Sequence, residues 1–137
     1  MIEMTAELAE KAVKAAQAKA RELKVNMTVS VVDESGRLVM TVRGNGCGYF
    51  TTDTSRGKAT ASAALRRSTK ALVERGNAPF LQSLPGLVPG QVLVSLGGVP
   101  VFKDGNCVGA LGCGGGTGDE DHECATAGAQ TIGSPTP

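Results

Sequence analysis

Apolar residues change their spacing along the chain, and each spacing predicts one kind of secondary structure. Between Thr5 and Leu23 they recur every three or four positions, which predicts an amphipathic helix with Thr5 as its N-cap. From Met27 to Val32 and again from Arg37 to Arg43 they alternate, and a short glycine-containing turn separates the two runs. This pattern predicts an antiparallel β-hairpin.

The middle of the chain is rich first in small residues and then in turn-forming residues. A helix-prone region extends from about Asp53 to Arg75 and is followed by Gly76, a C-cap candidate. Its run of alanines suggests close packing against another element. Proline and glycine punctuate the segment from Pro79 to Gly90, which predicts a loop. Gln91 to Leu96 then predict a short apolar strand.

The C-terminal part predicts a second hairpin and a last helix. Val99 to Phe102 and Cys107 to Leu111 are joined by an Asp-Gly turn. Gly112 to Gly118 form a glycine-rich loop, Asp119 to about Ile132 a helix, and Ser134 to Pro137 a frayed tail. The order α-β-β-α-β-β-β-α, with two hairpins, favours an α+β fold in which helices pack on an antiparallel sheet.

Length and charge exclude several functional classes. With 137 residues, positions 1–137 are expected to form a single domain. Fourteen Lys and Arg against thirteen Asp and Glu give a net charge of +1, so nothing favours nucleic acid or a membrane surface as partner. No apolar run approaches the roughly 20 residues of a spanning helix. The charged N-terminal stretch resembles no secretory signal, which predicts a cytoplasmic protein with free cysteine thiols.

The glycine-rich loop is the most informative feature for function. Glycines there let the backbone approach a ligand, so Cys113, Gly114, Gly115 and Gly116 are candidate ligand-binding residues. The loop lacks the Gly-Lys-Ser/Thr ending of a P-loop, and the three carboxylates that follow would repel a phosphate. It therefore forms either a cradle for a neutral or carboxylate-bearing ligand or a tight crossing from strand to helix.

Three cations are candidates for the recognition of such a ligand. Arg43 ends a predicted strand, and Arg56 and Lys58 lie near the start of the middle helix. If the connection folds back, the three side chains converge and complement an organic acid, because arginine pairs well with carboxylate. The alternative is that they form ordinary solvated surface.

Candidate proton carriers cluster at the start of the last helix. Asp121, His122 and Glu123, together with Lys58, are the candidate catalytic residues. His122 is the single histidine. Its sequence position leaves four alternatives open: a general base, a metal ligand, a haem ligand or a surface residue. Cys113 is either a thiolate activated near the helix start or a buried, inert thiol.

The segment from Gly97 to Gly112, which reads GGVPVFKDGNCVGALG, resembles the signature of the GlcG/HbpS family, often described as haem-binding. The hairpin turn from Val32 to Leu38, the pair Lys58-Ala59 and the stretch from Asp121 to Gly128 resemble further motifs of this family. The resemblance covers nearly the whole chain. It implies a profilin-like α/β fold, assembly into homo-oligomers (dimers or larger rings), and a relationship to a domain of PduO-type corrinoid adenosyltransferases.

The resemblance also implies what the protein binds. Haem is the expected cofactor, with His122 as the one imidazole able to ligate its iron, since the first helix carries no histidine. Two functions remain open. One is a binding protein for haem, another tetrapyrrole or an organic acid, and the other is a catabolic hydrolase, lyase or isomerase acting on a small organic acid. Both place the site where the glycine-rich loop meets the last helix and the side of Arg43 and Lys58.

Overall fold

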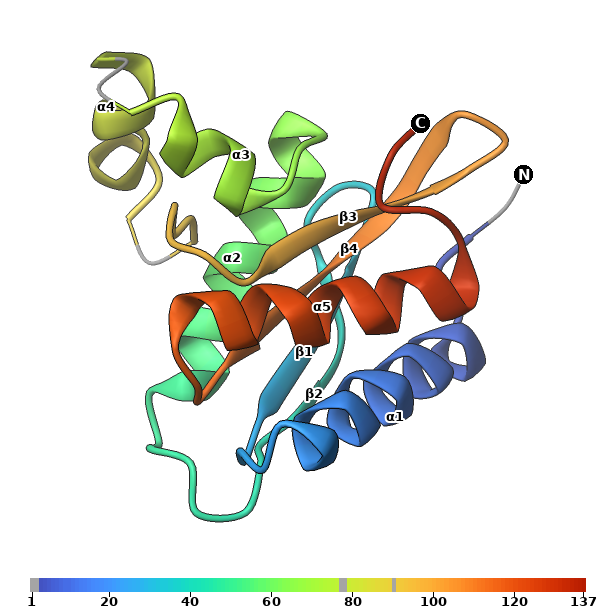
Figure 1. The fold of residues 1–137 in the computed structure, drawn as a ribbon. Helices are drawn as coiled ribbons and strands as arrows, with labels where there is room; N and C mark the ends of the chain where they lie inside the picture. The colour runs from blue at the N-terminus through green and yellow to red at the C-terminus, as the bar shows by residue number, and fades with distance from the viewer. Residues whose placement is uncertain (1–2, 77–78, 90) are drawn as a thin grey trace.

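A four-stranded antiparallel sheet with helices on both faces forms the core of the protein (Figure 1). The computed structural model describes residues 3–76, 79–89 and 91–137. Both expected hairpins are confirmed, and they join through the pairing of β1 with β4, which gives the strand order β2-β1-β4-β3. The strands are β1 (Thr28–Asp33), β2 (Leu38–Val42), β3 (Gly98–Lys103) and β4 (Asn106–Gly114).

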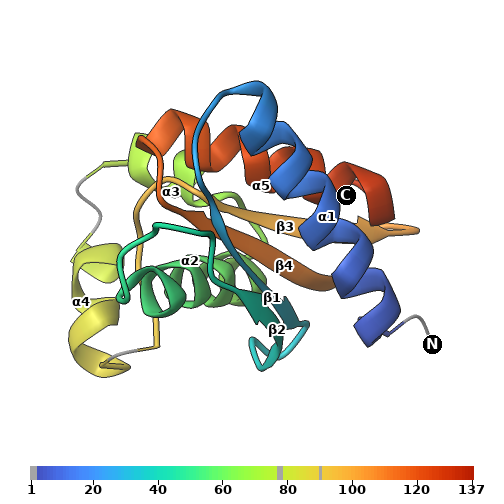
Figure 2. The ribbon, with the colours of Figure 1, turned by 90° about the horizontal axis from the view of Figure 1, so that it is seen from below.

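Three helices cover the sheet. Helices α1 (Ala6–Glu22) and α5 (Gly118–Ile132) lie side by side on one face, and α2 (Thr51–Leu65) packs on the other (Figures 1 and 2). The larger core lies under α1 and α5, because the strands point most of their large apolar side chains to that face. Its fully buried strand residues include Val29, Val31, Val99, Val101 and Leu111. The expected α+β class is therefore correct.

Small residues let the helices approach the sheet closely, as the alanine-rich pattern suggested. Gly112 lies in β4, and a Cβ there would overlap the backbone carbonyl of Ser55 on α2. Gly128 of α5 has the same role, since a Cβ there would overlap Leu111 and lie 2.8 Å from the carbonyl oxygen of Ala12. The backbone of α2 therefore rests directly on β4, which fixes the position of every side chain that α2 presents.

The expected middle helix is interrupted. Helix α2 ends at Leu65 because Arg66 adopts the left-handed conformation, with φ at 59°. The hydroxyl of Ser68 then accepts a hydrogen bond from the Ala71 N–H and caps a new helix, α3 (Thr69–Glu74). A serine N-cap is a recognisable signal, but the uninterrupted helix propensity of the surrounding residues concealed it.

Two further expectations about the connection to β3 are wrong. The predicted loop contains a helix, α4 (Pro79–Leu87), because proline is well tolerated in the first turn of a helix. Gly90, at the end of the predicted loop, lies outside the described residues. The segment from Gln91 to Leu96 forms no strand. Leu93 of this segment lies against α2 instead, where its N–H donates to the carbonyl of Gly57 at 3.1 Å.

The last residues are held against the sheet. Ser134 exchanges two backbone hydrogen bonds with Phe102 of β3, at 2.7 and 2.9 Å, so the predicted frayed tail is ordered there. None of the helices within the described residues is long and apolar enough to cross a membrane.

Candidate functional site

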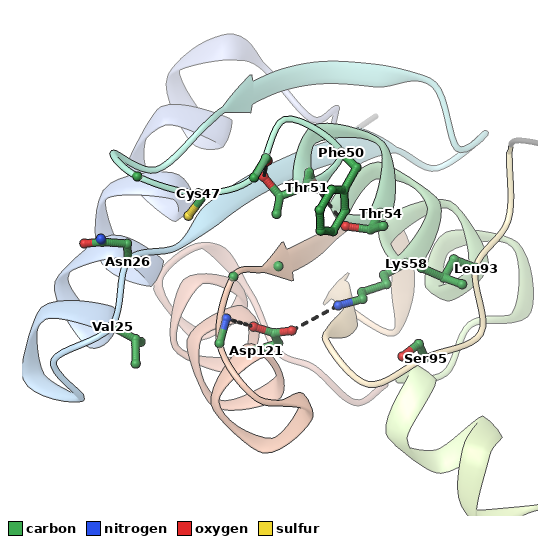
Figure 3. Close-up of a pocket in the computed structure, with 15 residues that line it drawn as sticks. Val25, Asn26, Cys47, Phe50, Thr51, Thr54, Lys58, Leu93, Ser95 and Asp121 are labelled. Atoms are coloured by element: carbon green, nitrogen blue, oxygen red, sulfur yellow. Dashed lines mark hydrogen bonds and ion pairs between the residues drawn. The ribbon is translucent and has the colours of Figure 1, made fainter.

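A cavity of about 560 Å³ opens where the glycine-rich loop meets the start of α5 (Figure 3). Helix α2 forms one wall through Thr51, Thr54 and Lys58, which share a helix face because they are three and four positions apart. The rest of the lining comes from the loop backbone, the start of α5, the segment before β3, the residues before β1 and the connection between β2 and α2. The expected site between the loop and Lys58 is therefore a real hollow in the molecule.

A buried ion pair forms part of the cavity wall. The Nζ of Lys58 donates to Oδ2 of Asp121 at 3.1 Å and to the carbonyl oxygen of Cys113 at 2.9 Å. The other carboxylate oxygen, Oδ1, accepts the N–H of Gly116 at 2.9 Å (Figure 3). Both charged side chains are buried. The pair therefore ties α2, β4, the glycine-rich loop and α5 together at one point.

The backbone of Gly97 passes directly over this pair. A Cβ at this position would lie 2.9 Å from the Cβ of Asp121 and 3.1 Å from the Cδ of Lys58, and its φ of 127° suits glycine. The Gly97 carbonyl also accepts the N–H of Cys113 at 2.9 Å. Gly97 thus excludes water from one side of the pair, while the cavity leaves the other side open.

Burial also changes the acidity of Asp121. Removal from water raises the pKa of this carboxyl above its ordinary value, and the neighbouring Lys58 ammonium and the Gly116 N–H oppose this effect only in part. A carboxyl whose charge is poorly solvated and which lies beside an ammonium is a group that can take up or release a proton when a ligand changes its surroundings.

The glycine-rich loop combines the two interpretations that its sequence left open. Gly112 belongs to β4 and serves the close crossing of α2, whereas Gly114, Gly115 and Gly116 line the cavity. At Gly115, φ is 131°, and a Cβ would lie 2.6 Å from the carbonyl oxygen of Asn26 and 3.0 Å from Sγ of Cys47. Position 115 thus requires glycine, because the Asn26 carbonyl leaves no room for a side chain there.

The other predicted cations do not join Lys58. Arg43 follows the edge strand β2, is exposed and does not line the cavity. Arg56 lies two residues before Lys58 on α2, so the helix directs it to another side, and it is not part of the lining either. The expectation that three cations converge is therefore wrong, and Lys58 supplies the positive charge of the described lining.

The candidate residues on α5 separate for the same reason. Successive helical residues differ in direction by about 100°. Asp121 is buried at the cavity, Glu123 is exposed, and His122 lines a different cavity on the other side of the helix start. Of the four candidate proton carriers, Lys58 and Asp121 are the two that the described structure brings together at the cavity.

The side chain of Cys113 belongs to the hydrophobic core. Its thiol is fully buried among the apolar residues of the sheet and the helices, and burial raises its pKa well above the ordinary value. Cys124, also buried, raises it further. Burial therefore favours the neutral thiol at Cys113, and this residue contributes to the site through the carbonyl that accepts from Lys58.

Several lining residues were not among the sequence candidates. Thr51 and Thr54 could have been found from their helical spacing to Lys58. Cys47 and Phe50 come from the connection between β2 and α2, and Leu93 from the segment without regular structure. No sequence pattern marks these three, because irregular backbone carries no periodicity that predicts the direction of a side chain.

Comparison with known proteins agrees with this architecture. The family model described as "Haem degrading protein HbpS-like" matches residues 4–130. This chain belongs to the HbpS-like family. Among curated HbpS-like relatives, Protein GlcG of Escherichia coli strain K12 is 32% identical over 110 residues, which cover 80% of this chain and 79% of that protein. A 15.0 kDa protein from the dhaT-dhaS intergenic region of Citrobacter freundii is 30% identical over 120 residues, 87% of this chain and 84% of that one.

Solved structures of HbpS-like proteins superpose closely. A double mutant of HbpS from Streptomyces reticuli has a TM-score of 0.86 and 33% identity, and the match covers 97% of this chain and 89% of that one. The crystal structure of a PduOC:heme complex has a TM-score of 0.85 and 26% identity, with 96% of each chain covered. The family that the sequence resemblance implied is therefore confirmed, and so is the α+β class with helices on an antiparallel sheet.

Proposed function

We propose that this HbpS-like protein binds a small organic acid in the cavity beside Lys58 and Asp121. The observation that supports the proposal is the position of a buried ammonium at the wall of an accessible cavity. Lys58 has three N–H groups, of which two serve Asp121 and Cys113, so one remains for a ligand. In a partly desolvated site, a charge-assisted hydrogen bond to a carboxylate is about twice as strong as a neutral one.

The rest of the lining suits a compact ligand with both polar and apolar parts. Thr54 and Ser95 offer hydroxyl groups, while Phe50 and Leu93 offer apolar surface (Figure 3). A hydroxyl-bearing carboxylic acid matches this combination, because its carboxylate meets Lys58 and its hydroxyl meets the side-chain oxygens. Lactate and malate are therefore suitable probes.

Titration calorimetry with lactate and malate tests the proposal. We expect saturable binding by the wild-type protein and at least about tenfold weaker binding by the double variant Lys58→Met/Asp121→Leu, which removes the ion pair as a unit. Lys11→Met, which removes an exposed lysine on α1, is the matched control and should bind as the wild type does. Equal affinities of the wild type and the double variant would disprove the proposal.

The affinity should also depend on pH in a defined direction. A bound carboxylate beside Asp121 favours the protonated form of this side chain, whose pKa is already raised by burial. Binding then takes up a proton, so the affinity rises as the pH falls from about 8 to about 5.5. The opposite trend would show that Asp121 does not face the ligand.

The same ion pair favours a second candidate function, that of a hydrolase, lyase or isomerase acting on a small organic acid. Lys58 and Asp121 are in direct contact, and the raised pKa of Asp121 allows the pair to hold or transfer a proton at the cavity wall. Conversion of the bound acid, followed by proton NMR during the titration, distinguishes an enzyme from a binding protein.

Haem, which the relatives suggest, fits this cavity poorly. His122, the expected iron ligand, does not line it, and Phe50 is the aromatic side chain of the described lining. The residues of this chain thus provide no imidazole site for haem iron next to Lys58.

A hemin titration of the wild type and of His122→Ala tests this conclusion. We expect the Soret spectra of the two proteins to be the same at every hemin concentration, because His122 is not at the cavity. A saturable Soret shift in the wild type that disappears in His122→Ala would contradict the expectation and restore histidine-ligated haem as the ligand. Assembly into homo-oligomers stays a prediction for this chain.

A further inference from the structure

A second cavity, of about 340 Å³, lies on the opposite side of the α5 start from Lys58. Five segments form it: the turn between α2 and α3, helix α3, strand β3, helix α5 and the C-terminal segment from Pro135 to Pro137. It contains Arg66 and Arg67 from the turn, Val99 from β3, His122 from α5 and Pro135 from the C-terminal segment. Nothing in the proposed function uses this cavity.

His122 presents hydrogen-bonding capacity that the protein leaves unused. Its Nδ1 is buried and has no hydrogen-bond partner among the described residues, and no described group bonds to Nε2. Burial lowers the pKa of this imidazole, and Lys70 on α3 lowers it further, while Asp119, Glu74 and Glu123 oppose the shift. The lowered pKa favours the neutral ring, in which one nitrogen carries a proton that it can donate to a ligand in the cavity.

The arginines give this cavity its charge. Arg66 is fixed at the end of α2 by its left-handed backbone, and its Nη1 donates to the Cys107 carbonyl at 3.4 Å. Within the described residues neither Arg66 nor Arg67 forms an ion pair with a carboxylate. Guanidinium groups without a carboxylate partner, next to a neutral imidazole, are complementary to an anion.

Most of the remaining lining is apolar, and three hydroxyl-bearing side chains lie among it: Ser68, Thr126 and Thr136. Val99 is buried at the base, and Ala71 and Pro135 add aliphatic surface. The proline-containing end segment holds its place because Ser134 is bonded to Phe102. A cavity with cations and an imidazole at one part and aliphatic walls elsewhere matches a molecule with one charged end and an apolar body.

We infer that this second cavity binds a small monocarboxylic acid with an apolar body, whose carboxylate is held by Arg67, Arg66 and the His122 imidazole. The inference does not rest on the function proposed for the Lys58 cavity. The two sites differ in charge, since the first holds a buried lysine–aspartate ion pair and the second holds exposed arginines that form no ion pair within the described residues.

The single histidine makes the test specific, because its imidazole signals in an NMR spectrum need no assignment. Benzoate is the probe, and benzyl alcohol is the control with the same ring but no charge. We expect saturable shifts of the His122 signals with benzoate and none with benzyl alcohol. Arg67→Ala should weaken the benzoate response at least about tenfold, whereas Arg21→Ala, an exposed arginine on α1, should leave it unchanged.

The double variant Lys58→Met/Asp121→Leu should retain the benzoate response, which separates this site from the first cavity. An absent or non-saturating response, or an equal response in Arg67→Ala, would overturn the inference. So would His122 signals that change with protein concentration instead of benzoate, because that result would mean that a second copy of the chain covers this cavity.

Discussion

Replacing Asp121 by asparagine is expected to lower the free energy of unfolding by about 3–5 kcal/mol, although the side chain keeps its shape. The variant removes the charge that compensates the buried Lys58 ammonium. It also replaces one carboxylate oxygen by an N–H₂ group. That group then faces either the Lys58 ammonium or the Gly116 N–H, both of which are donors, and one hydrogen bond is lost. Urea denaturation followed by circular dichroism measures the change.

The double variant Lys58→Met/Asp121→Leu is the control for this result. It removes both charges and fills the space with apolar groups, so most of the lost stability should return. Ligand binding should stay weak in the double variant, because this variant lacks the Lys58 N–H that is proposed to bind the ligand. If the double variant were as unstable as Asp121→Asn, the broken ion pair would not be the cause of the lower free energy of unfolding.

The second large effect is expected at Gly112, where no side chain takes part in chemistry. Its alanine variant places a methyl group against the Ser55 carbonyl of α2, so the helix must move away from β4. Overpacking of this kind costs about 1–3 kcal/mol, and a backbone atom in the way favours the upper end of that range. Because Lys58 is on the same helix, the displacement also weakens its contacts with Cys113 and Asp121. Thermal denaturation and the lactate titration measure the two consequences.

Gly86→Ala is the matched control, since this residue lies in α4 and a Cβ there meets no atom within 4 Å. Its melting temperature should be unchanged or slightly higher, because alanine favours a helix over glycine. If Gly112→Ala is as stable as this control, α2 does not depend on direct backbone contact with β4.

The two effects share one physical cause. The sheet of this protein carries small residues where α2 crosses it, and this brings a lysine of α2 within reach of a carboxylate of α5 on the far side of the glycine-rich loop. Stability and ligand binding thus depend on the same narrow region, which is why a change at Gly112 is expected to alter both.

Local patterns determined most elements of the fold. Alternating residues predicted the first hairpin, an Asp-Gly turn predicted the second, and the spacing of apolar residues predicted α1. The GGVPVFKDGNCVGALG segment indicated the HbpS-like family. These signals are reliable because a hairpin or an amphipathic helix is specified by neighbouring residues. The break at Arg66 and the helix α4 escaped prediction, since a left-handed residue and a proline-initiated helix depend on a few side chains rather than on a period.

The sequence alone established an α+β protein with a glycine-rich loop ahead of its last helix, and it drew attention to Lys58, Asp121 and His122. Only the tertiary structure decided which of these residues meet. Lys58 and Asp121 are 63 positions apart and become partners because α2 and α5 enclose the end of β4. Asp121 and His122 are neighbours in the chain and belong to different cavities, because a helix directs successive side chains to different sides.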